Sequence, residues 1–255
     1  MASQLDVATK SHGSVVGQPL KRLEDQRFIT GSATYMDGID LPNMLHASFV
    51  RSTYAHARIT HTDTSLALQH PSARLVLTAE SIVNEMGLMP TVESEEQGKA
   101  TPRYPFGIDE ANFEGECLAM VVAEDAASAQ EVAELVQIDY DPLPVVIDPE
   151  NALKEDSPLV HSYLQSNLAY HNVKSSGNIK KAFREADHVV KASFRFPRLN
   201  AVPMETRGIV ASYDPAGGLI TVYVSSQSPH EIREDLATVL KLPEDKVRVI
   251  VPDMG

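Results

Sequence analysis

Short apolar runs and helical patterns alternate along the first 150 residues. Residues 45–50 and 74–78 are apolar runs of strand length. Residues 79–82 follow the second run directly and are expected to open a short helix. A polar, irregular stretch at 84–114 contains several prolines and glycines, and connections of that length are usually functional or mobile.

The clearest local pattern lies between residues 115 and 147. Residues 117–123 are apolar throughout and predict a buried strand, Asp125 can cap the helix that follows, and alternation from Val136 to Tyr140 indicates another strand. Because strand, helix and strand follow one another with short joints, the stretch favours a βαβ unit, right-handed if its strands are parallel.

The chain then divides into a polar linker and a second module. Residues 151–176 are predicted to be the linker, and residues 1–20, with few periodic apolar positions, an extended N-terminal arm. From Gly177 the pattern predicts a helix, a strand over 190–196, a hairpin around 214–218, a helix opened by the capping box Ser228-Pro-His-Glu231, and a strand over 247–251. This last strand has no further element to cover it, so another polypeptide is expected to complete the module.

Composition describes an ordinary globular protein. Hydrophobic residues make up 43% and charged residues 22% of the 255 positions. No apolar run reaches the roughly 18 residues of a membrane span, and the first 17 residues lack the apolar core of a secretory signal. We therefore expect a soluble, cytoplasmic protein without a membrane span.

Charge and cysteine content exclude several kinds of site. The net charge of −13 argues against a nucleic-acid surface. Cys117 is the one cysteine of the sequence, so the chain cannot form an internal disulfide or a thiolate cluster, and its apolar surroundings favour a buried, inert thiol. No glycine-rich loop lies between a strand and a helix, so direct binding of FAD or NAD is not expected.

Many short motifs resemble, in order and spacing, the large subunits of the xanthine oxidase family. Those of the first half are Arg22-Leu-Glu-Asp25, Phe28-Ile-Thr-Gly31, Tyr35-Met-Asp37, Leu41-Pro42, Met44-Leu-His-Ala47, Arg51-Ser-Thr-Tyr-Ala-His-Ala-Arg-Ile59, Gly115-Glu116 and Tyr140-Asp-Pro-Leu-Pro144. Those of the second half are Ala182-Phe183, Ala186-Asp187, Met204-Glu205, Arg207, Ser226-Gln227, Pro229-His230 and Val247-Arg-Val249. The family includes aldehyde oxidoreductases, carbon monoxide dehydrogenases and N-heterocycle hydroxylases.

The chain also departs from the family pattern. Gly38 stands where an acidic residue is usual, and Thr53, Cys117 and Thr206 stand where proline is usual. The family follows the last strand with a glycine-rich loop ending in Phe-Gly, and this sequence reaches only Gly255, where that loop would begin.

The resemblance implies an α+β chain with an α/β hammerhead domain at residues 21–150 and the first part of a molybdenum-cofactor-binding domain at 177–255. It implies the N-terminal portion of the catalytic subunit of a molybdenum hydroxylase, which hydroxylates an aldehyde, an N-heterocycle or carbon monoxide with water-derived oxygen. This portion would be inactive alone. A free-standing binding or assembly protein that reuses the hammerhead scaffold is the alternative.

The resemblance also implies cofactors and partners. A molybdenum–pterin cofactor, as molybdopterin or its cytosine dinucleotide form, would bind only together with the C-terminal half of the subunit. Iron–sulfur and FAD groups would belong to partner subunits. The resemblance places no catalytic residue or metal ligand in this chain.

Gln227 and Gly255 are the candidate cofactor-binding residues. Gln227 lies between a strand end and a helix start, where free N–H groups favour anionic ligands, and by resemblance its amide would hydrogen-bond an oxo ligand of the molybdenum. It could instead satisfy backbone groups at the joint. Gly255 would add backbone to the cofactor loop, or be simply the end of the chain.

Other titratable residues are expected to be structural. Glu205 could serve as a general base, but an ion pair with Arg207 is favoured. His230 is expected to face solvent or cap its helix, and His56 and Arg58 to make subunit or domain contacts. The spacing of the remaining candidates does not suit metal binding: His46, His61 and His70.

Overall fold

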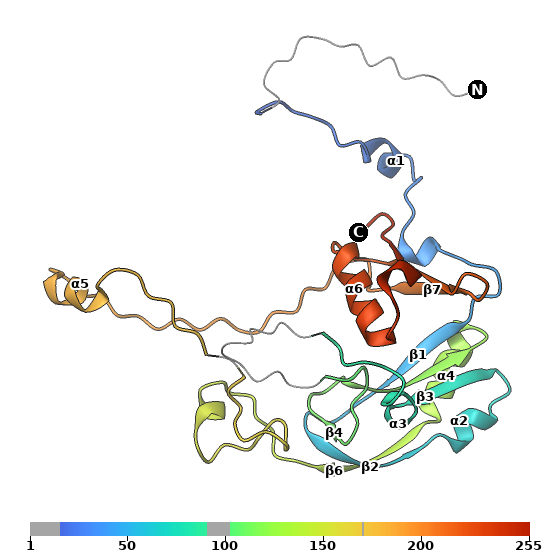
Figure 1. The fold of residues 1–255 in the computed structure, drawn as a ribbon, viewed down its shortest axis with the longest axis horizontal. Helices are drawn as coiled ribbons and strands as arrows, with labels where there is room; N and C mark the ends of the chain where they lie inside the picture. Colours follow the sequence, from blue (N-terminus) through green and yellow to red (C-terminus); the bar gives the residue numbers. More distant parts are fainter. Residues whose placement is uncertain (1–15, 91–102, 170) are drawn as a thin grey trace.

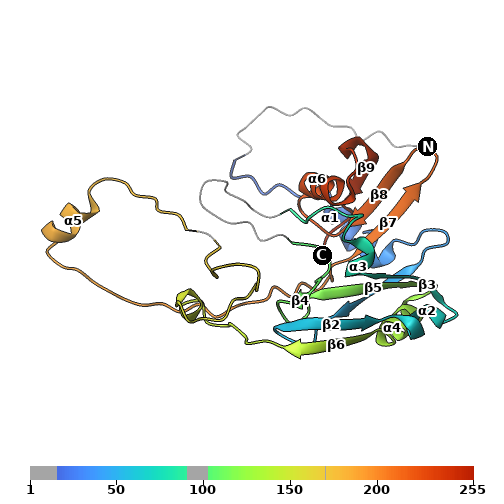
Figure 2. The same ribbon diagram turned by 60° about the horizontal axis from the view of Figure 1, so that its bottom comes forward.

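The computed structural model describes residues 16–90, 103–169 and 171–255. Two small sheets with short helices form the part of the chain expected to be the hammerhead, and a third sheet with one long helix forms the C-terminal part (Figure 1). Between them, residues 151–169 and 171–208 include a helix that stands away from the sheets in both ribbon views (Figures 1 and 2). The fold is therefore α+β.

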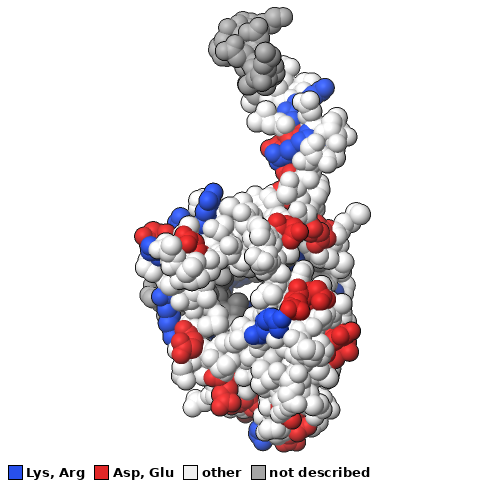
Figure 3. Space-filling view, turned by 90° about the vertical axis from the view of Figure 1, so that its right-hand side faces the viewer, with Lys and Arg blue, Asp and Glu red and all other residues white. Residues whose placement is uncertain are grey.

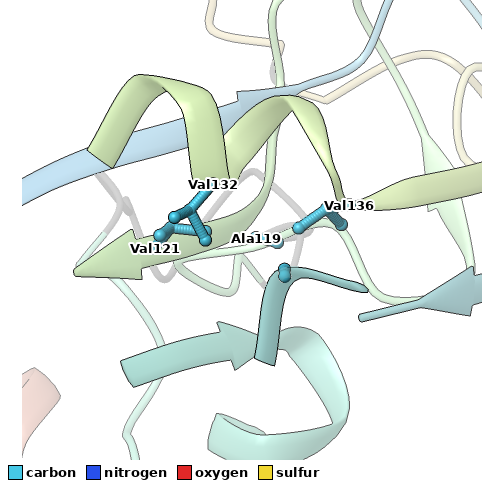
Figure 4. Packing of buried hydrophobic residues seen from close by; sticks show 5 residues of the cluster. Ala119, Val121, Val132 and Val136 are labelled. Carbon is cyan, nitrogen blue, oxygen red and sulfur yellow. The ribbon is translucent and has the colours of Figure 1, made fainter. Parts of the chain in front are cut away.

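The first sheet carries the core of the hammerhead. It consists of β1 (His46–Arg51), β5 (Cys117–Ala123) and β3 (Ala73–Thr78), with β5 central and antiparallel to both neighbours. Because β5 has strands on both sides and helix α4 (Ala126–Glu134) contacts it, its apolar run is buried. Val121 of β5 and Val132 of α4 face each other with no exposed surface (Figure 4).

The second sheet corrects the predicted βαβ unit. It consists of β4 (Glu110–Ala111), β2 (Ala57–Asp63) and β6 (Gln137–Pro142) in that order, all antiparallel. β5 and β6 therefore lie in different sheets, and the prediction that they form one βαβ unit is wrong. Both neighbouring positions of β5 are occupied by β1 and β3, so β6 pairs with β2 instead.

The local helix signals of the hammerhead are confirmed. Asp125 accepts a hydrogen bond from the backbone N of Ser128 at 2.9 Å and caps α4. The predicted short helix is α3 (Ala79–Ile82). The pattern did not predict the remaining short helices, which are α1 (Asp25–Ile29), η1 (Met36–Gly38), α2 (Ser65–Gln69) and η2 (Asn151–Leu153).

The third sheet contains the βαβ unit of the chain. β7 (Ile209–Asp214) and β8 (Leu219–Val224) form the predicted hairpin, and β8 pairs in parallel with β9 (Val247–Ile250). Helix α6 (Pro229–Leu240) and the short η3 (Glu244–Lys246) connect these parallel strands. Pro229 begins the helix as predicted, but Ser228 makes no side-chain cap bond, so the predicted capping box is wrong.

The predicted strand over 190–196 is absent from this structure. Helix α5 (Ile179–Glu185) forms as expected and is capped by Asn178, but the residues after it are extended and pair with no described strand. Residues 16–20 contain no helix or strand, residues 1–15 of the predicted arm lie outside the described residues, and so do residues 91–102 of the long connection.

The C-terminal end of α6 contacts the hammerhead. The backbone N of Gly87 donates to the carbonyl of Val239 at 2.6 Å, and Lys241 Nζ donates to the carbonyl of Asn84 at 2.9 Å. A Cβ atom at Gly87 would lie 2.7 Å from the Thr238 carbonyl oxygen. Glycine at this position therefore allows the helix to approach the loop after α3.

Glu116 gives the hammerhead a testable pH dependence. Burial raises the pKa of Glu116 above its ordinary value of 4.5, although the backbone N of Asn112 donates to its carboxylate at 2.5 Å. The folded protein therefore holds this proton more tightly than the unfolded chain, and stability falls as pH rises from about 4.5 through the raised pKa. In Glu116→Gln, whose amide oxygen can still accept from Asn112, thermal unfolding from pH 4 to 8 should show a smaller fall. A fall equal to that of the wild type would contradict this assignment.

Candidate cofactor-binding site

The carboxyl ends of β8 and β9 lie side by side. Tyr223 is paired with Ile250 in the parallel ladder, so the chain after Val224 and the chain after Ile250 leave the same edge of the sheet. Helix α6 begins there too, at Pro229. We name residues 225–229 and 251–255 the β8–β9 edge. Ligands of α/β units characteristically bind at such carboxyl ends.

Gln227 lies on the loop of this edge with its amide unused. It is exposed and forms no hydrogen bond with another described residue. The loop is held instead by serines, because Ser226 Oγ accepts from the backbone N of Ser228 at 3.1 Å and Ser225 Oγ accepts from that of Gly208 at 3.2 Å. The amide of Gln227 is therefore available to a ligand.

The first turn of α6 has no side-chain cap and contains one acidic residue, Glu231. Ser228 does not cap it, and Pro229 has no N–H group. His230, the next residue, is exposed as expected for a solvent-facing histidine. A helix start without a side-chain cap leaves backbone N–H groups that favour a negatively charged group.

Gly255 is held at the edge by Glu205. The backbone N of Gly255 donates to Glu205 Oε2 at 2.6 Å, and the backbone N of Met36 donates to Oε1 at 3.2 Å. The favoured ion pair between Glu205 and Arg207 is wrong for this structure, because no ion pair joins these two described residues. Both carboxylate oxygens of Glu205 accept from backbone groups instead. A Cβ at residue 255 would lie 2.9 Å from that of Glu205, so this contact by itself favours glycine.

Asp253 joins the same edge to the N-terminal part of the chain. Its carboxylate accepts from Arg27 and, at 3.0 Å, from the backbone N of Thr34, whose carbonyl in turn accepts from the backbone N of Asp253 at 3.0 Å. Sequence reasoning missed Asp253 and this role of Glu205, because their partners are far away in the chain. Together these contacts fix residues 253–255 beside the segment from Arg27 to Met36.

Glu205→Ala should loosen this arrangement. The Met36 amide would lose a hydrogen bond to a charged acceptor, so its hydrogen exchange in the isolated chain should quicken by about 10-fold. Glu234→Ala, which removes an exposed carboxylate from α6, should leave that exchange unchanged. Equal exchange in wild type and Glu205→Ala would show that the carboxylate does not hold the segment.

The other sequence candidates lie in the hammerhead. His56 is buried, with Nδ1 2.7 Å from the carbonyl oxygen of Pro144, and Arg58 forms a 3.7 Å ion pair with Asp141. Both therefore make contacts inside the hammerhead. Burial raises the pKa of the half-buried Cys117 thiol, which favours the unreactive protonated form.

The described surface carries charges of both signs. Acidic and basic side chains are interspersed on the face drawn in Figure 3, without a continuous basic patch. Among residues 16–90, 103–169 and 171–255, no three His, Cys, Asp or Glu side chains are grouped to hold a metal ion. No helix in this described part is long and apolar enough to cross a membrane.

Two family models match the chain. Residues 30–144 match the aldehyde oxidase and xanthine dehydrogenase a/b hammerhead domain, and residues 160–255 match the molybdopterin cofactor-binding domain. The second match contains Gln227, Gly255 and the whole β8–β9 edge.

Known proteins with these domains resemble the chain along nearly its whole length. The carbon monoxide dehydrogenase large chain of Hydrogenophaga pseudoflava is 36% identical over 246 residues, 91% of this chain and 30% of the relative. The nicotine 6-hydroxylase large subunit of Paenarthrobacter nicotinovorans is 34% identical, covering 95% of this chain and 30% of its own length.

Solved structures give the same result. Quinoline 2-oxidoreductase from Pseudomonas putida 86 superimposes with a TM-score of 0.85 at 32% identity, over 92% of this chain and 30% of that chain. Carbon monoxide dehydrogenase from Oligotropha carboxidovorans superimposes with a TM-score of 0.82 at 35% identity, over 94% of this chain and 31% of that chain. The chain spans less than a third of the length of each of these four proteins. It belongs to the xanthine oxidase family of molybdenum hydroxylases and corresponds to a part of their large subunit.

Proposed function

We propose that the chain forms the N-terminal portion of the catalytic subunit of a molybdenum hydroxylase and that its β8–β9 edge holds one side of a molybdenum–pterin cofactor. The observation that carries the proposal is the parallel β8–α6–β9 unit. It brings an uncapped helix start, the unused amide of Gln227 and residues 251–255 to one edge, inside the part that matches the molybdopterin cofactor-binding domain.

The residues present suit this group. The pterin carries a phosphate, whose negative charge is favoured by the unbonded N–H groups at the uncapped start of α6. The exposed amide of Gln227 can donate to a ligand of the molybdenum. Gly255 would contribute its backbone carbonyl, because its N–H is already bonded to Glu205. The bound cofactor supplies the two-electron redox chemistry, while these residues bind and orient it. Molybdopterin and its cytosine dinucleotide form share the phosphate that this edge would bind.

The other groups that the reaction needs would lie on other polypeptide segments or subunits. The C-terminal half of the subunit would supply the other side of the cofactor site and the general base, and iron–sulfur and FAD subunits would carry the electrons away. The substrate is an aldehyde, an N-heterocycle or carbon monoxide, and the assembly acts in the cytoplasm. The alternative is a free-standing binding or assembly protein, and the match of residues 160–255 to the molybdopterin cofactor-binding domain favours the enzyme over it.

Turnover by the isolated chain and by the native assembly tests this division. Residues 1–255 alone should not oxidise an aldehyde or an N-heterocycle with an artificial electron acceptor, whereas the native assembly purified through a tag on this chain should oxidise its substrate. Sustained turnover by the isolated chain would contradict the proposal, because a complete site would then lie within these residues.

A further inference from the structure

Two carboxylates lie at the β8–β9 edge, where the proposed cofactor would bring the negative charge of its phosphate. Asp253 belongs to the edge, and the carboxylate of Glu205 is bonded to the backbone N of Gly255. Like charges repel one another, and the repulsion grows where water is excluded from between them. An edge that receives an anion therefore needs the charge of these carboxylates to be compensated.

The two carboxylates are compensated in different ways. Both oxygens of Glu205 accept hydrogen bonds from backbone N–H groups. The carboxylate of Asp253 accepts from the backbone N of Thr34 at 3.0 Å and also forms an ion pair with Arg27. Among the described residues, this is the one ion pair that reaches the β8–β9 edge or Glu205.

The charge of Asp253 depends on Arg27 more than on water. The side chain of Asp253 is 9% exposed, whereas that of Arg27 is 50% exposed. Removing one partner of a buried ion pair leaves a charge without compensation, whereas an exposed charge is stabilised by solvent. Glu231, the acidic residue in the first turn of α6, is exposed and can remain hydrated. Arg27 is therefore the group that keeps the buried part of this edge neutral.

Helix α1 and the turn after it bring Arg27 to Asp253, although the two residues are 226 positions apart. The carbonyl of Arg27 accepts from the backbone N of Ser32 at 2.8 Å, and Gly31, with a φ of 72°, lies within this turn. The chain then reaches Thr34, whose carbonyl accepts from the backbone N of Asp253 at 3.0 Å. The same short segment thus contacts both the backbone and the carboxylate of Asp253.

We infer that Arg27 is a positioning residue of the cofactor site, which cancels the charge of Asp253 so that the β8–β9 edge can take an anionic cofactor. The inference rests on the proposed function. Arg27 acts through Asp253 and does not touch the cofactor, so its charge is needed only while Asp253 keeps its own. Arg27 also precedes both matched ranges, 30–144 and 160–255, so part of the site depends on a residue outside the matched domains.

Paired substitutions in the native assembly, purified through a tag on this chain, test the inference by its molybdenum content. Arg27→Met keeps a long side chain without its charge and should lower the molybdenum per chain by about 10-fold or more. Arg27→Lys keeps the charge and should retain most of the molybdenum. The double variant Arg27→Met with Asp253→Asn should regain it, because the asparagine can still accept from Thr34 but carries no charge. A merely structural ion pair would not give this rescue, since the double variant lacks the pair as well.

Arg22→Met is the matched control. Arg22 is exposed like Arg27, and the guanidinium groups of both lie over the Phe28 ring, but Arg22 pairs with the nearby Asp25. This variant should keep the full molybdenum content. Full molybdenum in Arg27→Met, or a double variant as depleted as Arg27→Met, would overturn the inference and leave the proposed function standing. A wild-type assembly without molybdenum would contradict the proposed function and this inference with it.

Hydrogen exchange in isolated residues 1–255 tests the contact without any cofactor. The Asp253 amide should exchange about 3- to 10-fold faster in Arg27→Met than in the wild type, because the ion pair that holds the two segments together is lost. Arg22→Met should leave this exchange unchanged. Equal exchange in Arg27→Met and the wild type would also overturn the inference, since Arg27 would then not hold Asp253.

Discussion

Replacing Gln227 with alanine should lower turnover of the molybdenum-loaded assembly by about 10- to 100-fold, the usual loss when a group that orients a metal ligand is removed. The amide lies at the β8–β9 edge without a hydrogen bond to another described residue, so its removal breaks no contact within the chain. The Tm of isolated residues 1–255 should therefore stay at the wild-type value. Turnover, molybdenum content and Tm are the three measurements.

Gln69→Ala is the matched control for this variant. Gln69 is an exposed glutamine at the end of α2 in the hammerhead, far in the chain from the β8–β9 edge. Its replacement should leave turnover and molybdenum content unchanged. Wild-type turnover and full molybdenum content in Gln227→Ala would remove Gln227 from the cofactor site.

Val121→Asp should prevent the hammerhead from folding. Val121 is fully buried on the central strand of the first sheet, against Val132 of α4 (Figure 4). An unpaired carboxylate at such a position costs about 4 kcal/mol or more, which is comparable to the whole stability of many domains. The expected result is insoluble protein, or a urea midpoint far below that of the wild type.

Leu75→Asp controls for the added charge. Leu75 lies on β3 beside β5, but its side chain is 46% exposed, so the carboxylate can remain hydrated. This variant should unfold near the wild-type urea midpoint. If Val121→Asp and Leu75→Asp lost equal stability, the core would not be centred on β5 and α4.

The strands of the hammerhead could be predicted because burial leaves a local signal, whereas their pairing leaves none. The apolar run of β5 and the cap at Asp125 identify strand and helix from neighbouring residues alone. Alternation reports which face of a strand is buried but does not report which strand lies beside it. The βαβ unit was therefore predicted at β5–α4–β6, while the structure forms it at β8–α6–β9.

The candidate site could be predicted only in part for the same reason. Gln227 was identified from its place between a strand and a helix together with the family resemblance. Glu205 was assigned to Arg207, two residues away, whereas its partners Met36 and Gly255 are 169 and 50 residues distant. The strand predicted over 190–196 is a different case, because its pattern is clear but these residues pair with no described strand.

Metal and pterin analysis of the native assembly, purified through a tag on this chain, tests the central claim most directly. The proposed cofactor role of the β8–β9 edge predicts molybdenum and a pterin in amounts equal to that of the chain. A homogeneous native assembly that contains this chain in full but neither molybdenum nor pterin would contradict it.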